Sequence, residues 1–146
     1  MSAAKSLTPD ELDTVLAYID TKPFAQRNRA MLLMTVLAGL RVSEVAGLMV
    51  TDVVDDRGRI RSEIFLAADR VKHGHARTIY ISTRLQAELD LYKRSRTWVN
   101  RDIPFFATIK GQRCPFSANT LTQHFYWLYK RAGVTGASSH SGRKTF

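Results

Sequence analysis

The chain has 146 residues, 45% of them hydrophobic, so it can bury one core and has the common size of a single domain. Twenty-two Lys and Arg residues against thirteen Asp and Glu give a net charge of +9, which favours a polyanionic partner such as nucleic acid. The single cysteine, Cys114, excludes an intrachain disulfide and a metal cluster built from cysteines.

The first expected helix begins at a Thr-Pro-Asp-Glu motif. Residues 1–6 are interpreted as a flexible lead-in. Thr8 is then predicted as the N-cap, Pro9 as the first helical residue and Glu11 as the partner in a capping box. Apolar residues at helical spacing extend this helix to about Asp20.

A second helix is predicted over roughly residues 26–38, ended by Gly39, and a third near Ser43, which is the expected N-cap. The longest apolar run, residues 30–40, is far shorter than the ~20 residues that a membrane span needs, so it predicts a buried helix and no membrane partner. The N-terminus has no signal-peptide pattern, and a cytoplasmic location is expected.

The middle of the chain changes to β patterning after a turn cluster at residues 55–58. Strands are predicted over residues 60–66 and 78–81, and the basic, glycine-centred residues 70–77 between them predict a β-hairpin with a basic tip. His73 and His75 flank this glycine, but nothing nearby completes a metal site, so phosphate or solvent contact is the preferred interpretation.

The rest of the chain is predicted to be mainly helical. Helices are expected over residues 84–96 and 118–132, with a loop between them that includes a short strand at Phe105 and Phe106. In the last helix the spacing favours a buried stripe and leaves Tyr126, Lys130 and Arg131 for surface contacts. The pattern predicts an α+β domain, mainly helical, with helices packed around a small antiparallel β-sheet.

Charge is distributed unevenly along the chain. Residues 1–56 contain five basic and eight acidic residues, a net charge of −3, whereas residues 57–146 contain seventeen and five, a net charge of +12. The surface that meets a polyanion is therefore expected in the second part.

Two motifs suit the handling of phosphate. Arg41 follows a helix and a glycine, and Glu44 lies one helical turn further on, where it can brace the guanidinium. His140 and Arg143, three residues apart after two serines that are candidate N-caps, share one helix face. Each motif also has an ordinary explanation, a helix-surface ion pair for the first and a solvated basic turn for the second.

Three segments, in order, resemble the boxes of the tyrosine recombinases, the phage-integrase family of DNA breaking-rejoining enzymes. AGLRVSEVAGLMVTDV resembles the box of the first arginine, VKHGHARTIYI the β-hairpin with its lysine, and AGVTGASSHSGRKTF the His-x-x-Arg box. Together they cover nearly the whole chain from Leu7 onwards. The resemblance implies that residues 7–146 are a partial catalytic domain of this kind.

The resemblance also implies roles for four residues. Arg41 and Arg143 would clamp the non-bridging oxygens of the scissile phosphate, Lys72 would protonate the leaving 5′-oxygen, and His140 would assist proton transfer or orient the phosphate. The same comparison predicts DNA contacts for three further residues: His75, Arg77 and Lys144. It implies no metal and no cofactor, because arginines supply the positive charge.

The sequence departs from the family pattern at its end. Gly142 stands where the family has a leucine and Lys144 where it has a second histidine, and no tyrosine follows Arg143. The five tyrosines, Tyr18, Tyr80, Tyr92, Tyr126 and Tyr129, all precede the His-x-x-Arg box. The expected fold is therefore incomplete at the C-terminus, and the N-terminal DNA-clamping domain of the family is missing.

These observations predict a truncated recombinase domain that binds double-stranded DNA, with other recombinase protomers as further partners and no small-molecule substrate. It is expected to be bacterial or phage-encoded, to associate with the nucleoid when bound to DNA, and to be inactive by itself, which leaves its standing as an enzyme open. One alternative is a non-catalytic DNA-binding remnant that occupies sites or pairs with an intact recombinase, and another is a basic scaffold for a different polyanion.

Overall fold

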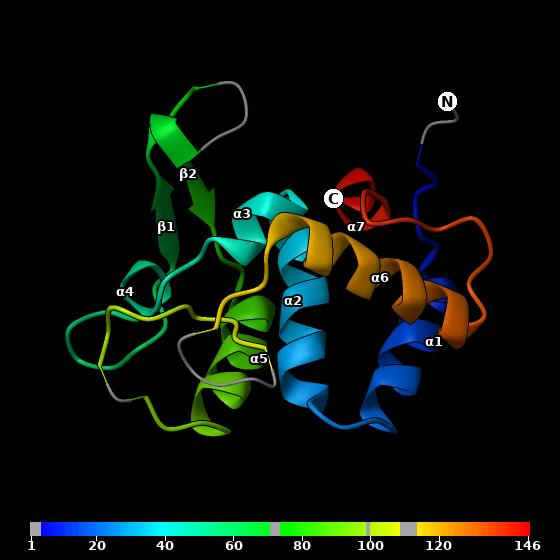
Figure 1. The fold of residues 1–146 in the computed structure, drawn as a ribbon, viewed down its shortest axis with the longest axis horizontal. Helices are drawn as coiled ribbons and strands as arrows, with labels where there is room; N and C mark the ends of the chain where they lie inside the picture. The colour runs from blue at the N-terminus through cyan, green and yellow to red at the C-terminus, as the bar shows by residue number, and fades with distance from the viewer. Residues whose placement is uncertain (1–3, 71–73, 99, 109–113) are drawn as a thin grey trace.

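A computed structural model describes residues 4–70, 74–98, 100–108 and 114–146, and Figure 1 shows their arrangement. Helix α2 (Ala25–Ala38) runs through the centre, and ten of its fourteen residues are buried. Helix α1 (Pro9–Asp20) and helix α6 (Ala118–Ala132) pack on one side of the molecule, and helix α5 (Thr83–Arg94) packs against α2 on the other. The α+β class with a helical majority is confirmed.

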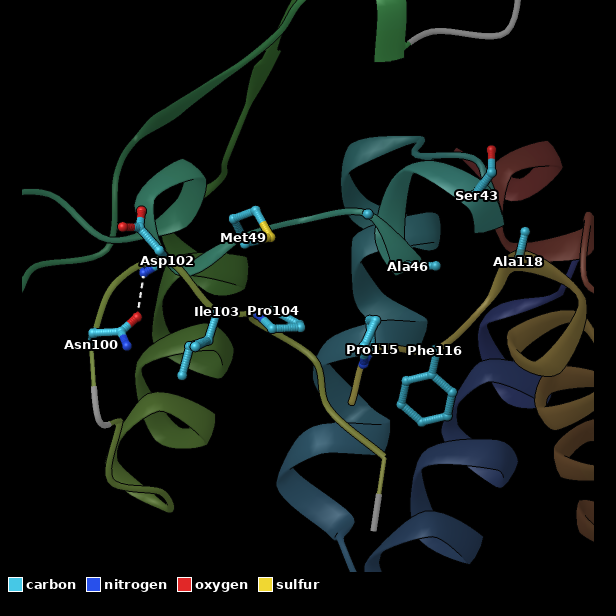
Figure 2. Close-up of a pocket in the computed structure, with 11 residues that line it drawn as sticks. Ser43, Ala46, Met49, Asn100, Asp102, Ile103, Pro104, Pro115, Phe116 and Ala118 are labelled. Atoms are coloured by element: carbon cyan, nitrogen blue, oxygen red, sulfur yellow. Dashed lines mark hydrogen bonds between the residues drawn. The ribbon is translucent and has the colours of Figure 1, made fainter. Parts of the chain in front are cut away.

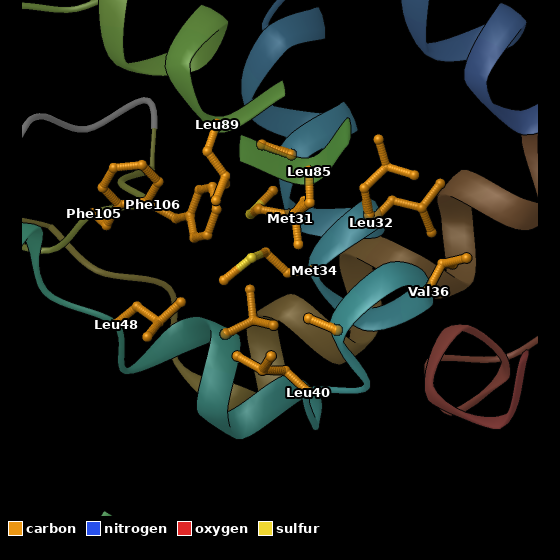
Figure 3. Packing of buried hydrophobic residues seen from close by; sticks show 14 of the residues in the cluster. Met31, Leu32, Met34, Val36, Leu40, Leu48, Leu85, Leu89, Phe105 and Phe106 are labelled. Atoms are coloured by element: carbon orange, nitrogen blue, oxygen red, sulfur yellow. The ribbon is translucent and has the colours of Figure 1, made fainter. Parts of the chain in front are cut away.

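The core forms around α2 because this helix is buried on almost every face and is almost entirely apolar from residue 30 onwards. Figure 3 shows Met31 of α2 next to Leu85 and Leu89 of α5, with Met34 and the ring of Phe106 in the same cluster. All five of these side chains are fully buried. Packing of this kind holds the two ends of α2 in place, and the chain that follows its C-terminal end carries Arg41.

The β-hairpin consists of β1 (Glu63–Leu66) and β2 (Arg77–Tyr80), paired antiparallel with Leu66 opposite Arg77. The 3₁₀ turn η1 (Ala68–Arg70) follows β1. Figure 1 places the hairpin at the end of the molecule away from α1. Residues 71–73, which include Lys72 and His73, lie outside the described residues.

Several predicted boundaries are confirmed by capping geometry. In α1, the Thr8 hydroxyl accepts from the backbone N–H of Glu11, and the Glu11 carboxylate accepts from the N–H of Thr8. Helix α6 ends at Gly133 and α2 at Gly39, both in the left-handed conformation that favours glycine.

Other predictions about local structure were wrong. The third helix, α3 (Val42–Ala46), has its N-cap two residues earlier than expected, at Arg41 rather than Ser43. Ile60 forms only an isolated bridge with Val54, and the loop around Phe105 holds isolated bridges rather than a strand. The short helix α4 (Val50–Val53) was not predicted, because four residues are too few for a periodic signal.

The last helix, α7 (Ser141–Thr145), lies beside the start of the described chain. The backbone N–H of Leu7 donates to the hydroxyl of Thr145 at 2.8 Å, and Lys5 donates to the carbonyl oxygen of Thr135 at 3.2 Å. Figure 1 shows both ends of the chain on the same side of the molecule. In this way α7 is held between the lead-in and α2.

Candidate active site

The position of Arg41 follows from the way α2 ends. Gly39 has a φ of +71°, a conformation that favours glycine, and a Cβ atom there would also displace the exposed ring of Phe146, which would lie 2.3 Å away. The chain then buries Leu40 completely and continues extended through Arg41. This sharp exit directs the Arg41 side chain away from the core.

Glu44 holds Arg41 in position through contacts to its backbone and its side chain. Its carboxylate is 1% exposed and accepts from the backbone N–H of Arg41 at 2.8 Å, while the Arg41 guanidinium lies 3.8 Å away. The guanidinium of Arg77 donates to both carboxylate oxygens of Glu44, at 2.5 Å to Oε2 and 2.7 Å to Oε1. Burial alone would raise the pKa of Glu44, but the Arg77 and Arg41 hydrogen bonds outweigh it and lower the pKa below its ordinary value.

Arg77 is engaged within the protein by its pair with Glu44, and its contact with DNA stays a prediction. It begins β2, and its guanidinium fork is engaged by Glu44 with its side chain 28% exposed. A planar fork on a buried carboxylate has a fixed direction. The structure thus uses Arg77 to tie the hairpin to α3.

The other arm of the hairpin carries a similar anchor. Arg70 donates to both carboxylate oxygens of Asp52, at 2.9 and 2.8 Å, and to the carbonyl oxygen of Gly47 at 3.1 Å. Sequence reasoning missed this pair, and eighteen residues of separation gave no signal that could have found it. Since Arg70 and Arg77 are both anchored, the two ends of the segment that contains Lys72 are fixed on α3 and α4. His75 lies in the same segment and is exposed.

Helix α7 brings the second motif, His140 and Arg143, to the same side of the molecule as Arg41. It packs on α2 at Gly142, where a Cβ atom would lie 1.9 Å from the Thr35 hydroxyl and 2.7 Å from the Thr35 Cβ. The leucine that the family pattern has at this position would not fit against Thr35. The residue before the helix is His140, whose N–H donates to the hydroxyl of Ser138 at 3.3 Å.

These elements form one cavity of about 660 Å³. Its lining combines cationic and small residues from the lead-in, α3, α6 and α7: Ala4, Leu40, Arg41, Val42, Ser43, Ala118, Thr122, Ser139, His140, Arg143 and Lys144. Three predicted catalytic residues, Arg41, His140 and Arg143, are thus brought together with Lys144. We call this space the phosphate cavity.

The charge balance of the phosphate cavity suits an anion. In the described part of the chain, no carboxylate forms an ion pair with Arg143. Burial, together with the neighbouring positive charges of Arg41 and Arg77, lowers the pKa of Arg143, and Glu44 opposes this only in part. A phosphate between the guanidinium groups would relieve the repulsion and accept hydrogen bonds from both arginines.

A tyrosine is absent from the lining that the structure describes. Tyr92 and Tyr129 are buried, and burial raises the pKa of both phenols. Tyr80 and Tyr126 are exposed and Tyr18 is half-buried, but none of the five lines the phosphate cavity.

A larger hollow lies next to the phosphate cavity and differs from it in chemistry. Figure 2 shows this space of about 780 Å³, bounded by α3, the start of α6 and the loop near Asn100 and Asp102. It shares Ser43 and Ala118 with the phosphate cavity. The lining that the structure describes carries one carboxylate and no cationic side chain, so it does not suit a phosphate.

The described residues contain no group of three His, Cys, Asp or Glu side chains that could hold a metal ion. Within the same ranges, no helix combines the length and the apolar composition needed to cross a membrane.

The chain is similar to a known protein family and to several solved structures. The model of the Phage integrase family matches residues 5–146. No curated protein matched the chain. Among solved structures, the crystal structure of XerA recombinase aligns with a TM-score of 0.75 at 22% identity, covering 100% of this chain and 50% of that one.

Two other solved structures are similar. The Tn1549 transposon integrase in complex with a circular intermediate DNA has a TM-score of 0.73 at 20% identity, covering 100% of this chain and 52% of that one. The lambda integrase tetramer bound to a Holliday junction has a TM-score of 0.73 at 19% identity, covering 99% and 42%. The chain thus spans about half the length of these structures. With a family model matched over almost its whole length, it belongs to the phage integrase family of tyrosine recombinases.

Proposed function

We propose that the chain captures a backbone phosphate of double-stranded DNA in the phosphate cavity, as the phosphate-binding part of a site that cleaves and rejoins DNA strands. Arg41 and Arg143 would each donate to non-bridging oxygens of the scissile phosphate. Their juxtaposition across one cavity, with Glu44 fixing Arg41 and with Arg143 unpaired in the described residues, is the observation that carries this proposal.

The chemistry needs groups on both sides of the phosphorus. A tyrosine hydroxyl would attack phosphorus and give up its proton to a neighbouring base or to solvent, forming a 3′-phosphotyrosine bond, and the bond to the 5′-oxygen would break. Lys72 would give its proton to that leaving oxygen, while His140 orients the phosphate or assists proton transfer. Rejoining reverses these steps, with the free 5′-hydroxyl of a new partner as the attacking group. The anchored arms at Arg70 and Arg77 support delivery of Lys72 to the same phosphate.

We further propose that the 146-residue polypeptide by itself binds DNA without cleaving it, because its five tyrosines lie away from the phosphate cavity. Under this proposal the attacking tyrosine comes from outside these residues, supplied by further chain or by another recombinase protomer. A polypeptide that only binds could still occupy sites or pair with an intact recombinase.

Binding of a labelled DNA duplex, followed by fluorescence anisotropy, tests phosphate capture. The variants Arg41→Ala and Arg143→Ala should each weaken binding about tenfold. Each should also reduce the slope of log affinity against log salt concentration by about one, the value for one lost phosphate contact. The matched control is Arg84→Ala, which removes an exposed charge from α5. Equal losses in all three variants would show that binding depends on diffuse charge, which favours the non-catalytic module and rejects the phosphate cavity.

A nicked DNA substrate that traps a covalent intermediate tests the second point. We expect no adduct with the 146-residue polypeptide. An adduct mapped by mass spectrometry to Tyr18, Tyr80 or any other of the five tyrosines would show that the nucleophile lies within this chain.

A further inference from the structure

A second cationic surface lies on the side of the molecule formed by α1 and α6. Its side chains, which define the α1–α6 surface, are Tyr18, Lys22, Tyr126, Trp127, Lys130 and Arg131. Two of them are large aromatic side chains with unusual exposure, Tyr126 at 45% and Trp127 at 43%. Figure 1 shows α1 and α6 at the end of the molecule opposite the hairpin. Exposed aromatic groups of this size commonly mark an interaction site.

The cations of this surface rest on aromatic rings. Lys130 Nζ lies 5.7 Å from the ring centre of Tyr126 and 5.3 Å from that of Trp127, and Arg131 lies 5.3 Å from the Trp127 ring. Lys22 lies 5.5 Å from the Tyr18 ring. Over the part of the chain that the structure describes, none of these three cations forms an ion pair with a carboxylate. The rings orient the cations but leave their charge uncompensated.

Between α1 and α6 the surface is hollowed. The hollow has a volume of about 370 Å³, with Tyr18 and Trp127 in its wall and Lys22 and Arg131 among its lining residues. His124 also lines it, and the buried Nε2 atom of this residue has no hydrogen-bond partner among the described groups. Burial lowers the pKa of His124 to about 4, so the ring is neutral near pH 7 and adds no positive charge to the hollow.

We propose that the α1–α6 surface binds an acidic segment of a protein partner, which inserts one apolar side chain into the hollow and sets its carboxylates against Lys22, Lys130 and Arg131. Three uncompensated cations provide charge complementarity to such a segment. Trp, Tyr and Arg are also the residue types that dominate binding energy at protein interfaces.

The concave shape favours a protein segment over duplex DNA. A hollow of this size accepts a projecting side chain, whereas a duplex presents its phosphates on a convex surface that does not enter it. The hollow and the phosphate cavity share no lining residue. Both sites can therefore be occupied at once, and the proposal goes beyond capture of DNA.

A short fluorescein-labelled peptide rich in Glu and Asp, with a Leu-Phe pair at its centre, provides the probe. The full chain should bind it with micromolar affinity, and Lys130→Glu and Trp127→Ala should each weaken binding at least tenfold. Replacing the acids of the peptide by Gln and Asn, or its Leu-Phe pair by Gly-Ser, should weaken binding by a similar factor. The control variant Arg143→Ala should bind the peptide as the unchanged chain does.

Nuclear magnetic resonance locates the site independently, through shifts of the Trp127 indole and His124 ring signals when the peptide is added. Urea unfolding of each variant verifies that the fold is kept, since both substituted side chains are exposed. Failure of the peptide to bind at millimolar concentration, or equal binding by the Lys130→Glu variant, would overturn the proposal. A loss of duplex DNA binding in Lys130→Glu and Trp127→Ala as large as that in Arg143→Ala would instead assign the surface to DNA.

Discussion

Beside the phosphate cavity, the buried carboxylate of Glu44 holds Arg41, which lines the cavity, and Arg77, which does not, whereas on the α1–α6 surface Lys130 and Arg131 rest on aromatic rings. A guanidinium paired with a buried carboxylate has a fixed direction. A cation on a ring keeps its whole charge and some lateral freedom. The first arrangement suits a reacting phosphate whose oxygens have set positions, and the second suits partners whose acidic groups vary in position.

Replacing Glu44 by Ala should have the largest effect, because among the described residues it removes the one carboxylate that forms ion pairs with Arg41 and Arg77. Two partly buried guanidinium groups would then repel one another and Arg143. We expect the free energy of unfolding to fall by about 3–5 kcal/mol in urea titrations.

The control for Glu44 is Asp90→Ala. Asp90 pairs with Arg94, whose side chain is 73% exposed, so this substitution should cost less than about 1 kcal/mol. If the two substitutions lower the free energy of unfolding equally, Glu44 does not hold the arginines beside the phosphate cavity. The contrast between this cavity and the α1–α6 surface would then be wrong.

The neutral His124 beside the α1–α6 surface predicts the second effect, a loss of stability in mild acid. Its pKa is about 4 in the folded chain and near 6.5 when unfolded, so the unfolded state binds more protons between these values. The free energy of unfolding should therefore fall as the pH drops from 6.5 and level off near pH 4, losing up to about 3 kcal/mol.

The variant His124→Phe keeps an aromatic ring beside Phe116 and Phe125 but cannot be protonated. Urea unfolding at several pH values should show that this variant lacks the decline between pH 6.5 and pH 4. An unchanged decline would mean that groups other than His124 cause it, since both proteins keep all the other ionisable side chains.

Gly142 allows a third test, of the packing that places Arg143. The variant Gly142→Ala should lose about 1–3 kcal/mol, because the added Cβ atom meets Thr35. Thr35→Gly removes the obstacle, so the added Cβ should cost much less in the double variant, and a double-mutant cycle measures this coupling. The control Gly47→Ala adds a Cβ atom 3.4 Å from its nearest neighbour and should change little. A cost of Gly142→Ala that stays the same with Thr35→Gly would contradict the account of α7.

Local signals predicted much of the fold. The capping box at Thr8 and Glu11, the left-handed glycines at Gly39 and Gly133, and the alternating residues of the hairpin are all decided within a few residues, so they can be read from the chain directly. The start of α3 was misplaced because the buried Glu44 caps it from within the helix. That burial depends on Arg77, which lies thirty-three residues away.

The candidate site was predicted in part for the same reason. Arg41, His140 and Arg143 stood out because they lie in motifs whose order along the chain is informative, and the structure gathers them in one cavity. The Arg70–Asp52 anchor, by contrast, depends on the fold of the hairpin. The close packing of Gly142 on Thr35 likewise depends on how α7 meets α2, and no local pattern encodes either contact.

The smallest expected effect isolates the ring-held cation itself. Lys130 and Lys93 both occupy the last turn of a helix, so the helix dipole affects them alike, but Lys130 lies over two rings and Lys93 lies 3.9 Å from the carboxylate of Asp90. Changing either to Met keeps the stem and should cost about 0.5–1 kcal/mol or less. The free-energy costs of the two substitutions should differ once salt is added, because screening weakens the partly exposed ion pair of Lys93 more than a contact made at the ring face. Urea unfolding with and without added sodium chloride measures this, and a cost for Lys130→Met that vanishes in salt would mean that the rings do not hold the charge in place.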